Sequence, residues 1–429
     1  MGSEYSIIRH YKGEKEITYD ALFMNKGFSL VDRSTNTKYY FPVPDSISVD
    51  DFRVLDDTVW LCGATSSGAM VGCFDIASVF SPSGGLIDFC IFSRSPLWCQ
   101  NEHINDYLQY FSRLQVKRID RTLHLLLIGW ETSDSKDRQT YNSMVANLWR
   151  DASGLWKFHY TVDRDKLFQH DDLAVTDNYL VVTSTGGIGH LQPNSHNITA
   201  FKLPDIYHAL SGDGLLDCQT QLSPPPYAII TVPYQYIDLS LVNIFNLDTR
   251  VVAMEGDEVV TVCYGEAVNI PSQTVINVYS DPTIDPYIRC YFNSGFITYI
   301  REMAYNKQLG RLLFSPHCMN KIFWSDYPFT NVTSDEFNNG ENWFSVDCGG
   351  VKGDGVVSGS SNGYIHHYVW LHDATSPGRC YYQVNYSTVA IPEYQIKDDL
   401  VQCMKDIAVD WHEIHVDTKE HNIQVICTP

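Results

Sequence analysis

Two stretches of the chain decide its fold. Residues 50–62 read DDFRVLDDTVWLC and residues 171–183 read DDLAVTDNYLVVT, and the two align without a gap. In each, a short alternating strand leads into a tight turn, Asp56-Asp57 or Asp177-Asn178, and a more apolar strand follows. This pattern is typical of a β-hairpin. A Gly/Ser-rich loop and a third strand follow, at 70–76 and 197–203, so the unit has at least three antiparallel strands.

Weaker copies of this unit fill the rest of the chain. Their hairpins and third strands are expected at 113–129 with 144–149, 250–265 with 274–279, 302–314 with 321–325, 343–359 with 364–372, and 406–416 with 422–427. The last hairpin is expected to turn at Trp411-His412. Successive second strands lie about 60 residues apart on average, longer than the ~40–50 residues of the named propeller repeats, and long loops account for the excess.

Seven hairpin-based units predict an all-β fold, a β-propeller of about seven four-stranded blades forming a single domain over residues 1–429. Radial packing of blades leaves only short, protected edges. We expect the ring to be closed by N-terminal strands within 28–43 beside a C-terminal strand at 422–427, and we expect 204–245 to be an inserted loop region with a short helix at 205–211. Tandem β-sandwiches remain the alternative. A parallel α/β fold is disfavoured because no amphipathic helical stretch separates the strands.

The charge and the apolar content of the chain exclude some classes of function. The chain has 51 acidic and 30 basic residues and a formal net charge of −21. Nucleic-acid binding depends on Lys and Arg neutralising phosphates, so a nucleic-acid partner is not expected. No stretch reaches the roughly 18–20 apolar residues of a transmembrane helix. The polar start Met1–Ser6 is not a signal peptide.

The repeated strand-turn-strand pattern resembles that of the broad group of six- to eight-bladed propellers that includes WD40 and YVTN-type proteins. The Gly-His and Trp-Asp signatures of true WD40 repeats do not recur, and no sialidase Asp-box is present. The block VLDDTVWLCG at 54–63 is also similar to extracytoplasmic propeller proteins of gut Bacteroidales. That resemblance implies a periplasmic or cell-surface binding role, with the signal peptide absent from this sequence. A cytoplasmic location is the alternative.

The alignment of the units gives one equivalent position in each blade, placed where the first strand begins. It is expected to ring one mouth of the central channel with seven candidate ligand-binding residues: Asp51, Arg113, Asp172, Arg250, Glu302, Trp343 and Asp406. Guanidinium groups bind carboxylate or sulfate groups bidentately, and an indole stacks on a sugar or another ring. In the structural interpretation, which we weigh more heavily, neighbouring acids and arginines pair with each other at an exposed rim.

No motif predicts a metal, a cofactor or a catalytic residue. His366 and His367 are adjacent on a strand, so their side chains point to opposite faces and cannot chelate one metal ion. No Gly-x-Ser-x-Gly nucleophile motif occurs. We therefore expect a non-enzymatic propeller that binds a small molecule, a carbohydrate or a protein at one mouth of the channel. A glycoside hydrolase or lyase that uses the rim carboxylates, and an intracellular scaffold, are the alternatives.

Overall fold

The computed structural model describes the backbone of these ranges: 5–11, 25–32, 37–42, 47–65, 68–75, 85–93, 108–132, 141–150, 156–163, 168–186, 195–203, 228–233, 244–267, 270–284, 286–293, 300–307, 309–316, 321–336, 344–347, 355–361, 364–373, 376–384, 395–397, 409–416, 420–421 and 424–425. Its described side chains fall within residues 50–334. The described elements are strands, and none of them is an α-helix. Among these residues there is thus no helix that could span a membrane.

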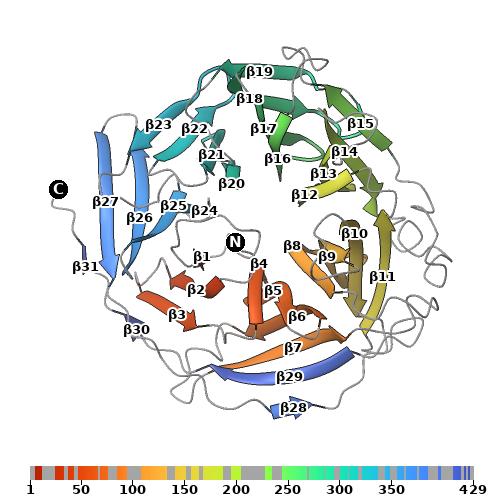
Figure 1. The fold of residues 1–429 in the computed structure, drawn as a ribbon. Helices are drawn as coiled ribbons and strands as arrows, with labels where there is room; N and C mark the ends of the chain where they lie inside the picture. Colours follow the sequence, from red (N-terminus) through yellow and green to blue (C-terminus); the bar gives the residue numbers. More distant parts are fainter. Residues whose placement is uncertain are drawn as a thin grey trace.

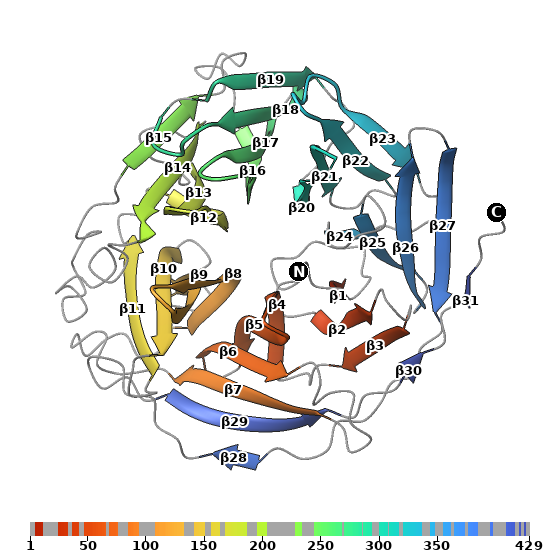
Figure 2. The same cartoon turned by 180° about the vertical axis from the view of Figure 1, so that it is seen from behind.

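The strands form seven antiparallel sheets arranged around a centre (Figures 1 and 2). Each sheet is one blade, and the blades are numbered here in chain order. Blade 1 contains β1 (Tyr5–Tyr11), β2 (Asn25–Asp32), β3 (Thr37–Pro42) and β30 (Glu420–His421). Blade 2 contains β4 (Ile47–Leu55), β5 (Thr58–Thr65), β6 (Gly68–Asp75), β7 (Gly85–Ser93), β29 (Val409–Val416) and β28 (Gln395–Lys397).

Blades 3 to 6 have four strands each. Blade 3 contains β8 (Leu108–Ile119), β9 (Thr122–Thr132), β10 (Tyr141–Arg150) and β11 (Trp156–Asp163). Blade 4 contains β12 (Phe168–Val175), β13 (Tyr179–Gly186), β14 (Ser195–Lys202) and β15 (Ala228–Pro233). Blade 5 contains β16 (Ile244–Ala253), β17 (Val259–Ala267), β18 (Ile270–Tyr279) and β19 (Ile288–Asn293). Blade 6 contains β20 (Ile300–Asn306), β21 (Arg311–Pro316), β22 (Lys321–Asp326) and β23 (Thr333–Glu336).

Blade 7 completes the ring with β24 (Phe344–Asp347), β25 (Gly355–Ser361), β26 (Tyr364–Asp373), β27 (Ser376–Val384) and β31 (Gln424–Val425). The first strand of each blade faces the centre, and the inner strands of consecutive blades contact one another, with β1 touching both β4 and β24. The protein is a seven-bladed β-propeller.

The C-terminal segment lies along the outside of three neighbouring blades. β28 and β29 extend blade 2, β30 completes blade 1, and β31 pairs with β27 of blade 7 (Figure 1). The N-terminal blade therefore receives its fourth strand from the C-terminus, in the register Lys38 opposite His421. The sequence placed that strand at 422–427, but in the structure it ends at His421, and residues 424–425 belong to the next blade.

Two other sequence expectations are corrected. The hairpin expected at 406–416 is wrong, because β29 runs straight through Trp411-His412 and pairs along its whole length with β7. The unit expected there is replaced by blade 1, which is built from the N-terminal strands and includes β1, a strand that the sequence analysis missed. The region 204–245 is also more than an inserted loop, because it contains β15, the outer strand of blade 4. The helix expected at 205–211 lies outside the described residues.

The hydrophobic core lies between the faces of neighbouring blades. One cluster joins Trp60 of blade 2 to Leu125 and Leu127 of blade 3, and another joins Leu126 and Ile128 to blade 4. Similar clusters lie between blades 4 and 5 and between blades 5 and 6. A middle strand of a blade is covered on both faces, which is why residues 123–130 are almost continuously apolar instead of alternating.

The predicted hairpins of first and second strands are confirmed in blades 2 to 6. In blades 2 and 3 the two turn residues have positive φ, at Asp56 (50°), Asp57 (61°), Asp120 (48°) and Arg121 (67°). Positive φ at both central residues gives the turn twist that suits a two-residue hairpin, and Asp tolerates that conformation better than most residues.

Candidate functional site

The inner strands of blades 2 to 6 share a local irregularity. Each contains a β-bulge or register shift, at Val49/Asp51, Phe111/Arg113, His170/Asp172, Phe245/Asp248 and Ile300/Glu302. A bulge sets two residues opposite one on the partner strand and re-aims the side chain that follows. In four of the five blades the residue after the shift is the equivalent position of the sequence alignment. In blade 5 the shift lies two residues before Arg250.

This irregularity explains one correction. The equivalent position does not lie where the first strand begins, because Asp51 is the fifth residue of β4 and Asp172 the fifth of β12. The bulge interrupts the polar-apolar alternation, so only the half of each strand beyond the bulge showed a strand pattern in the sequence. Asp51 and Asp172 therefore lie part-way along their inner strands.

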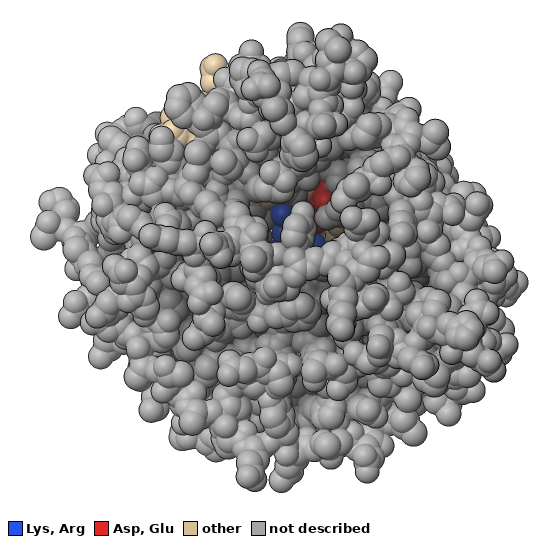
Figure 3. Space-filling model, in the orientation of Figure 1, with Lys and Arg blue, Asp and Glu red and all other residues tan. Residues whose placement is uncertain are grey.

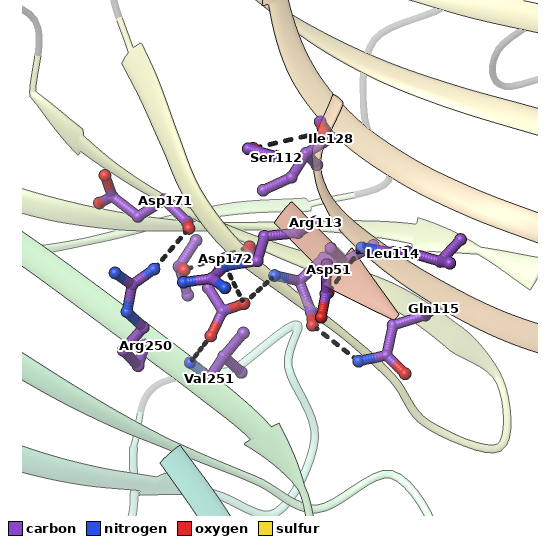
Figure 4. Close-up of polar contacts among 12 residues, drawn as sticks. Asp51, Ser112, Arg113, Leu114, Gln115, Ile128, Asp171, Asp172, Arg250 and Val251 are labelled. Atoms are coloured by element: carbon purple, nitrogen blue, oxygen red, sulfur yellow. Dashed lines mark hydrogen bonds and ion pairs between the residues drawn. The ribbon is translucent and has the colours of Figure 1, made fainter. Parts of the chain in front are cut away.

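Asp51 links blade 2 to blade 3. Its side chain is buried, with 0% of its surface exposed. One carboxylate oxygen accepts the backbone N–H of Leu114 at 2.8 Å (Figure 4). The other accepts a hydrogen bond from Nη1 of Arg53 at 2.6 Å. Leu114 directly follows Arg113, so the carboxylate of one blade bonds the backbone beside the equivalent position of the next.

Asp172 makes the same connection two blades further on. Its Oδ2 accepts the N–H of Val251, the residue after Arg250, at 3.2 Å, and its Oδ1 accepts the N–H of Leu173 at 3.0 Å. Nε of Arg113 lies 3.6 Å from Oδ1. Burial raises the pKa of Asp172, although the charges of Arg113 and Arg250 oppose the rise. This carboxyl group is thus a clamp among blades 3, 4 and 5.

Arg250 joins blade 5 to both of its neighbours. Its Nη1 donates to the carbonyl oxygen of Asp171 in blade 4 at 2.8 Å (Figure 4). Its Nε donates to the carbonyl oxygen of Ile300 in blade 6, also at 2.8 Å. The side chain is half-buried. These two bonds to neighbouring blades orient the guanidinium.

The structure thus brings together part of the predicted set. Arg113, Asp172 and Arg250 meet across blades 3 to 5, and Asp51 contacts the backbone beside Arg113. The side chain of Glu302 is outside the described residues, as are Trp343 and Asp406 altogether. Among the described members one acid pairs with one arginine, Asp172 with Arg113, and this pair lies between buried blade edges and not on an exposed rim.

Sequence reasoning missed His170, two residues before Asp172 on β12. Its two ring nitrogens are buried, and neither has a hydrogen-bond partner in the part of the chain described. Its backbone N–H donates to Oγ of Ser143 in blade 3 at 3.1 Å. Burial lowers the pKa of His170 to about 4, so the ring is neutral at pH 7. The available signal was the polar run His170-Asp171-Asp172 inside a strand, which marks the bulge.

The centre of the ring is hollowed on the face shown in Figure 3, and basic and acidic side chains are visible inside the hollow. Among described side chains, the arginines of the inner strands include Arg53, Arg113 and Arg250. No group of three or more metal-ligating side chains occurs among the residues described. The arrangement can hold an anionic or hydrogen-bonding ligand through guanidinium groups that neighbouring blades have already oriented.

Comparisons with known proteins add the following. No family model matches the chain. No curated protein sequence matches it either. Similar solved structures include a putative 6-phosphogluconolactonase from Bacteroides fragilis, with 10% identity, coverage of 88% of this chain and 93% of that one, and a TM-score of 0.46.

Two further solved structures are propellers. The β-propeller domain of Swd1 from Myceliophthora thermophila is 9% identical, covers 79% of this chain and 90% of its own, and has a TM-score of 0.42. The Dos1 propeller is 11% identical, with coverage of 86% and 92% and a TM-score of 0.43. Similarity at this level carries no argument about activity, so the function has to be argued from the site.

Proposed function

We propose that this protein is a non-enzymatic binding propeller that takes its ligand at a mouth of the central channel, where Arg250 contacts an acidic group of the ligand. The observation that carries the proposal is the double anchoring of Arg250 by carbonyl groups of blades 4 and 6. A guanidinium that is oriented before binding loses little conformational entropy when a carboxylate or sulfate arrives. Sugars bearing carboxylates, and acidic peptide groups, have this chemistry.

The same geometry argues against the hydrolase alternative for the described carboxylates. Glycoside cleavage needs two carboxyl groups that reach the substrate on either side of the scissile bond. Asp51 is 0% exposed and Asp172 is 8% exposed, and both oxygens of each accept hydrogen bonds from the protein. These two residues hold blades together and are poorly placed to act as acid and base.

The test is a thermal-shift measurement against uronic acids, neutral glycans, sulfated sugars and acidic peptides. A ligand that binds only the native state raises the melting temperature by mass action. We expect an acid-bearing compound to raise it in the wild type and not in Arg250→Gln, each variant being compared with its own ligand-free value. Arg121→Gln, in an exposed hairpin turn, is the matched control and should keep the full shift.

Two outcomes would contradict the proposal. A shift of equal size in Arg250→Gln would place the ligand elsewhere on the protein. The absence of any shift across the set would leave the channel without a small-molecule role, and a protein partner would become the better hypothesis.

We also propose that the protein works outside the cytoplasm. This proposal is supported only by the sequence resemblance to extracytoplasmic propellers. No disulfide links the described cysteines Cys62, Cys73, Cys263 and Cys290 to one another, so the proposal draws no support from one. Fractionation of the native host would test it, and recovery of the protein in the cytoplasmic fraction would contradict it.

A further inference from the structure

A second surface, separate from the proposed channel site, contains the exposed large apolar side chains of the described residues. These are Ile284, Tyr287, Leu309 and Tyr327, which are 48–51% exposed. They are called the tyrosine patch here. Ile284 and Tyr287 lie between β18 and β19, Leu309 lies between β20 and β21, and Tyr327 lies just after β22. The described hairpin turns of blades 2 to 4 expose polar and charged residues instead.

The tyrosine patch is continuous across the boundary between blades 5 and 6. The hydroxyl oxygens of Tyr287 and Tyr327 are 3.4 Å apart. The N–H of Tyr327 donates to the carbonyl oxygen of Gly310, next to Leu309, at 2.8 Å. Gly310 has a φ of +62°, which a residue with a side chain would adopt only under strain. Figures 1 and 2 both show β18–β19 beside β22–β23 on the outer half of the ring.

The loop that carries Tyr327 is anchored from below. Phe329 is fully buried, and its ring meets those of Tyr327 and Tyr305 edge-on, with centroids 5.6 and 6.5 Å apart. Its N–H donates to the carbonyl oxygen of Asp326 at 2.6 Å. An exposed aromatic ring fixed in this way loses little freedom when a partner covers it.

Carboxylates border the tyrosine patch. Glu258 accepts a hydrogen bond from the hydroxyl of Tyr287, Glu255 lies 2.9 Å from Nζ of Lys307, and Asp281 caps its own loop by accepting the N–H of Thr283. Burial, followed by the charges of Glu258 and Glu255, raises the pKa of the nearby Tyr305.

Asp326 is the fourth carboxylate of this border, and it pairs with Arg311 at 2.5 Å. Among the described side chains, four carboxylates therefore face two cations, Lys307 and Arg311, on a chain whose net charge is −21.

We propose that the tyrosine patch docks a cationic peptide segment of a partner protein, in which Lys or Arg side chains alternate with apolar ones. Exposed apolar patches rimmed by polar residues mark interaction sites, and Tyr is enriched among the residues that dominate binding energy. The apolar residues of the segment would cover Ile284 and Leu309. Its cations would lie over the tyrosine rings and against the carboxylates, where cation–π attraction and charge act together. This surface is independent of the channel site.

The experiment is affinity selection of a random peptide library on the full chain, followed by fluorescence anisotropy with the enriched peptides. We expect the enriched peptides to be rich in Lys and Arg beside aliphatic or aromatic residues, and to bind more weakly as salt increases. Tyr327→Ser should weaken binding about tenfold or more. Leu309→Ser and Glu258→Gln, which leave the Tyr327 loop unchanged, should weaken it by about threefold to tenfold.

Arg250→Gln and Arg121→Gln are the controls, and both should bind the peptides like the wild type. Enriched peptides that bind Tyr327→Ser and Leu309→Ser normally would overturn the proposal, as would acidic peptides or no enrichment at all. Sedimentation showing a dimer that Leu309→Ser dissociates would also overturn it, because the patch would then be a contact between two copies of this chain.

Discussion

The most informative perturbation is Asp172→Ala, because it separates a structural clamp from a ligand contact. The substitution removes the acceptor for the N–H groups of Val251 and Leu173 and the charge partner of Arg113. An unsatisfied buried N–H costs about 1–3 kcal/mol. Removing one member of a buried ion pair costs about 3–5 kcal/mol, because the remaining charge stays buried without its partner. These costs overlap, so we expect a loss of about 3–5 kcal/mol in the free energy of unfolding.

The assay is equilibrium urea unfolding at pH 7, followed by circular dichroism and by tryptophan fluorescence. Coincident transitions are required before a free energy is assigned to a protein of seven blades. Asp177→Ala, at the exposed turn of the same hairpin, is the control and should stay within about 0.5 kcal/mol of the wild type. A loss below about 1 kcal/mol for Asp172→Ala would refute the clamp and make this carboxyl group available to a ligand.

The pH dependence of stability gives an independent test of the role of Asp172. Asp172→Asn keeps the volume and one acceptor oxygen but cannot ionise. The raised pKa means that the folded state holds its proton more tightly than the unfolded state. The contribution of Asp172 to stability therefore falls as the pH rises from the ordinary value of 3.8 through the folded pKa, and this fall should be absent in Asp172→Asn.

Two other residues, His170 and Asp257, have lowered pKa values, so acidification should remove their contribution to stability. The pKa of His170 is about 4 in the folded state against an ordinary 6.5, so stability should fall by about 3 kcal/mol in total as the pH drops from 6.5 towards 4. Melting curves of His170→Gln should lack this fall. Identical pH profiles for the variant and the wild type would contradict the assignment. Asp257 joins the turns of blades 4 and 5 by accepting hydrogen bonds from Thr176 Oγ1 (2.8 Å), Asn178 N (2.9 Å) and Asn178 Nδ2 (2.7 Å). Burial opposes ionisation of Asp257, but these bonds outweigh it and lower its pKa, so Asp257→Ala should cost about 1–2 kcal/mol at pH 7 and approach the wild type as the pH falls below 3.8. Hydrogen exchange at the Asn178 amide should accelerate in Asp257→Ala, and unchanged exchange would argue against the link between the turns.

The charges at the equivalent positions of consecutive blades follow a regular order. Asp51, Arg113, Asp172 and Arg250 occupy consecutive blades and alternate in sign. Opposite charges at equivalent positions of neighbouring repeats predict contacts between the repeats, because consecutive inner strands lie edge to edge in a closed ring. The observed link from Asp172 to Arg113 and to the backbone beside Arg250 follows this rule.

The sequence by itself determined the repeated hairpin, its turns and its apolar middle strand. These features depend on neighbours within about 15 residues, where the alternation of side chains and the chemistry of the turn suffice. It could not determine which strand completes which blade. β29 was expected to fold on itself at Trp411-His412, yet it pairs with β7, more than 300 residues earlier in the chain.

The tertiary structure alone decided what the polar residues of the channel do. The sequence placed Asp51, Asp172 and Arg250 at equivalent positions, and it left open whether they meet a ligand or one another. Ring closure brings the inner strand of each blade against the next, and the bulges turn the carboxylates into that boundary. Once they are buried there, the cost of leaving a charge or an N–H group unpaired favours contacts between blades, and the half-buried Arg250 is held by blades 4 and 6.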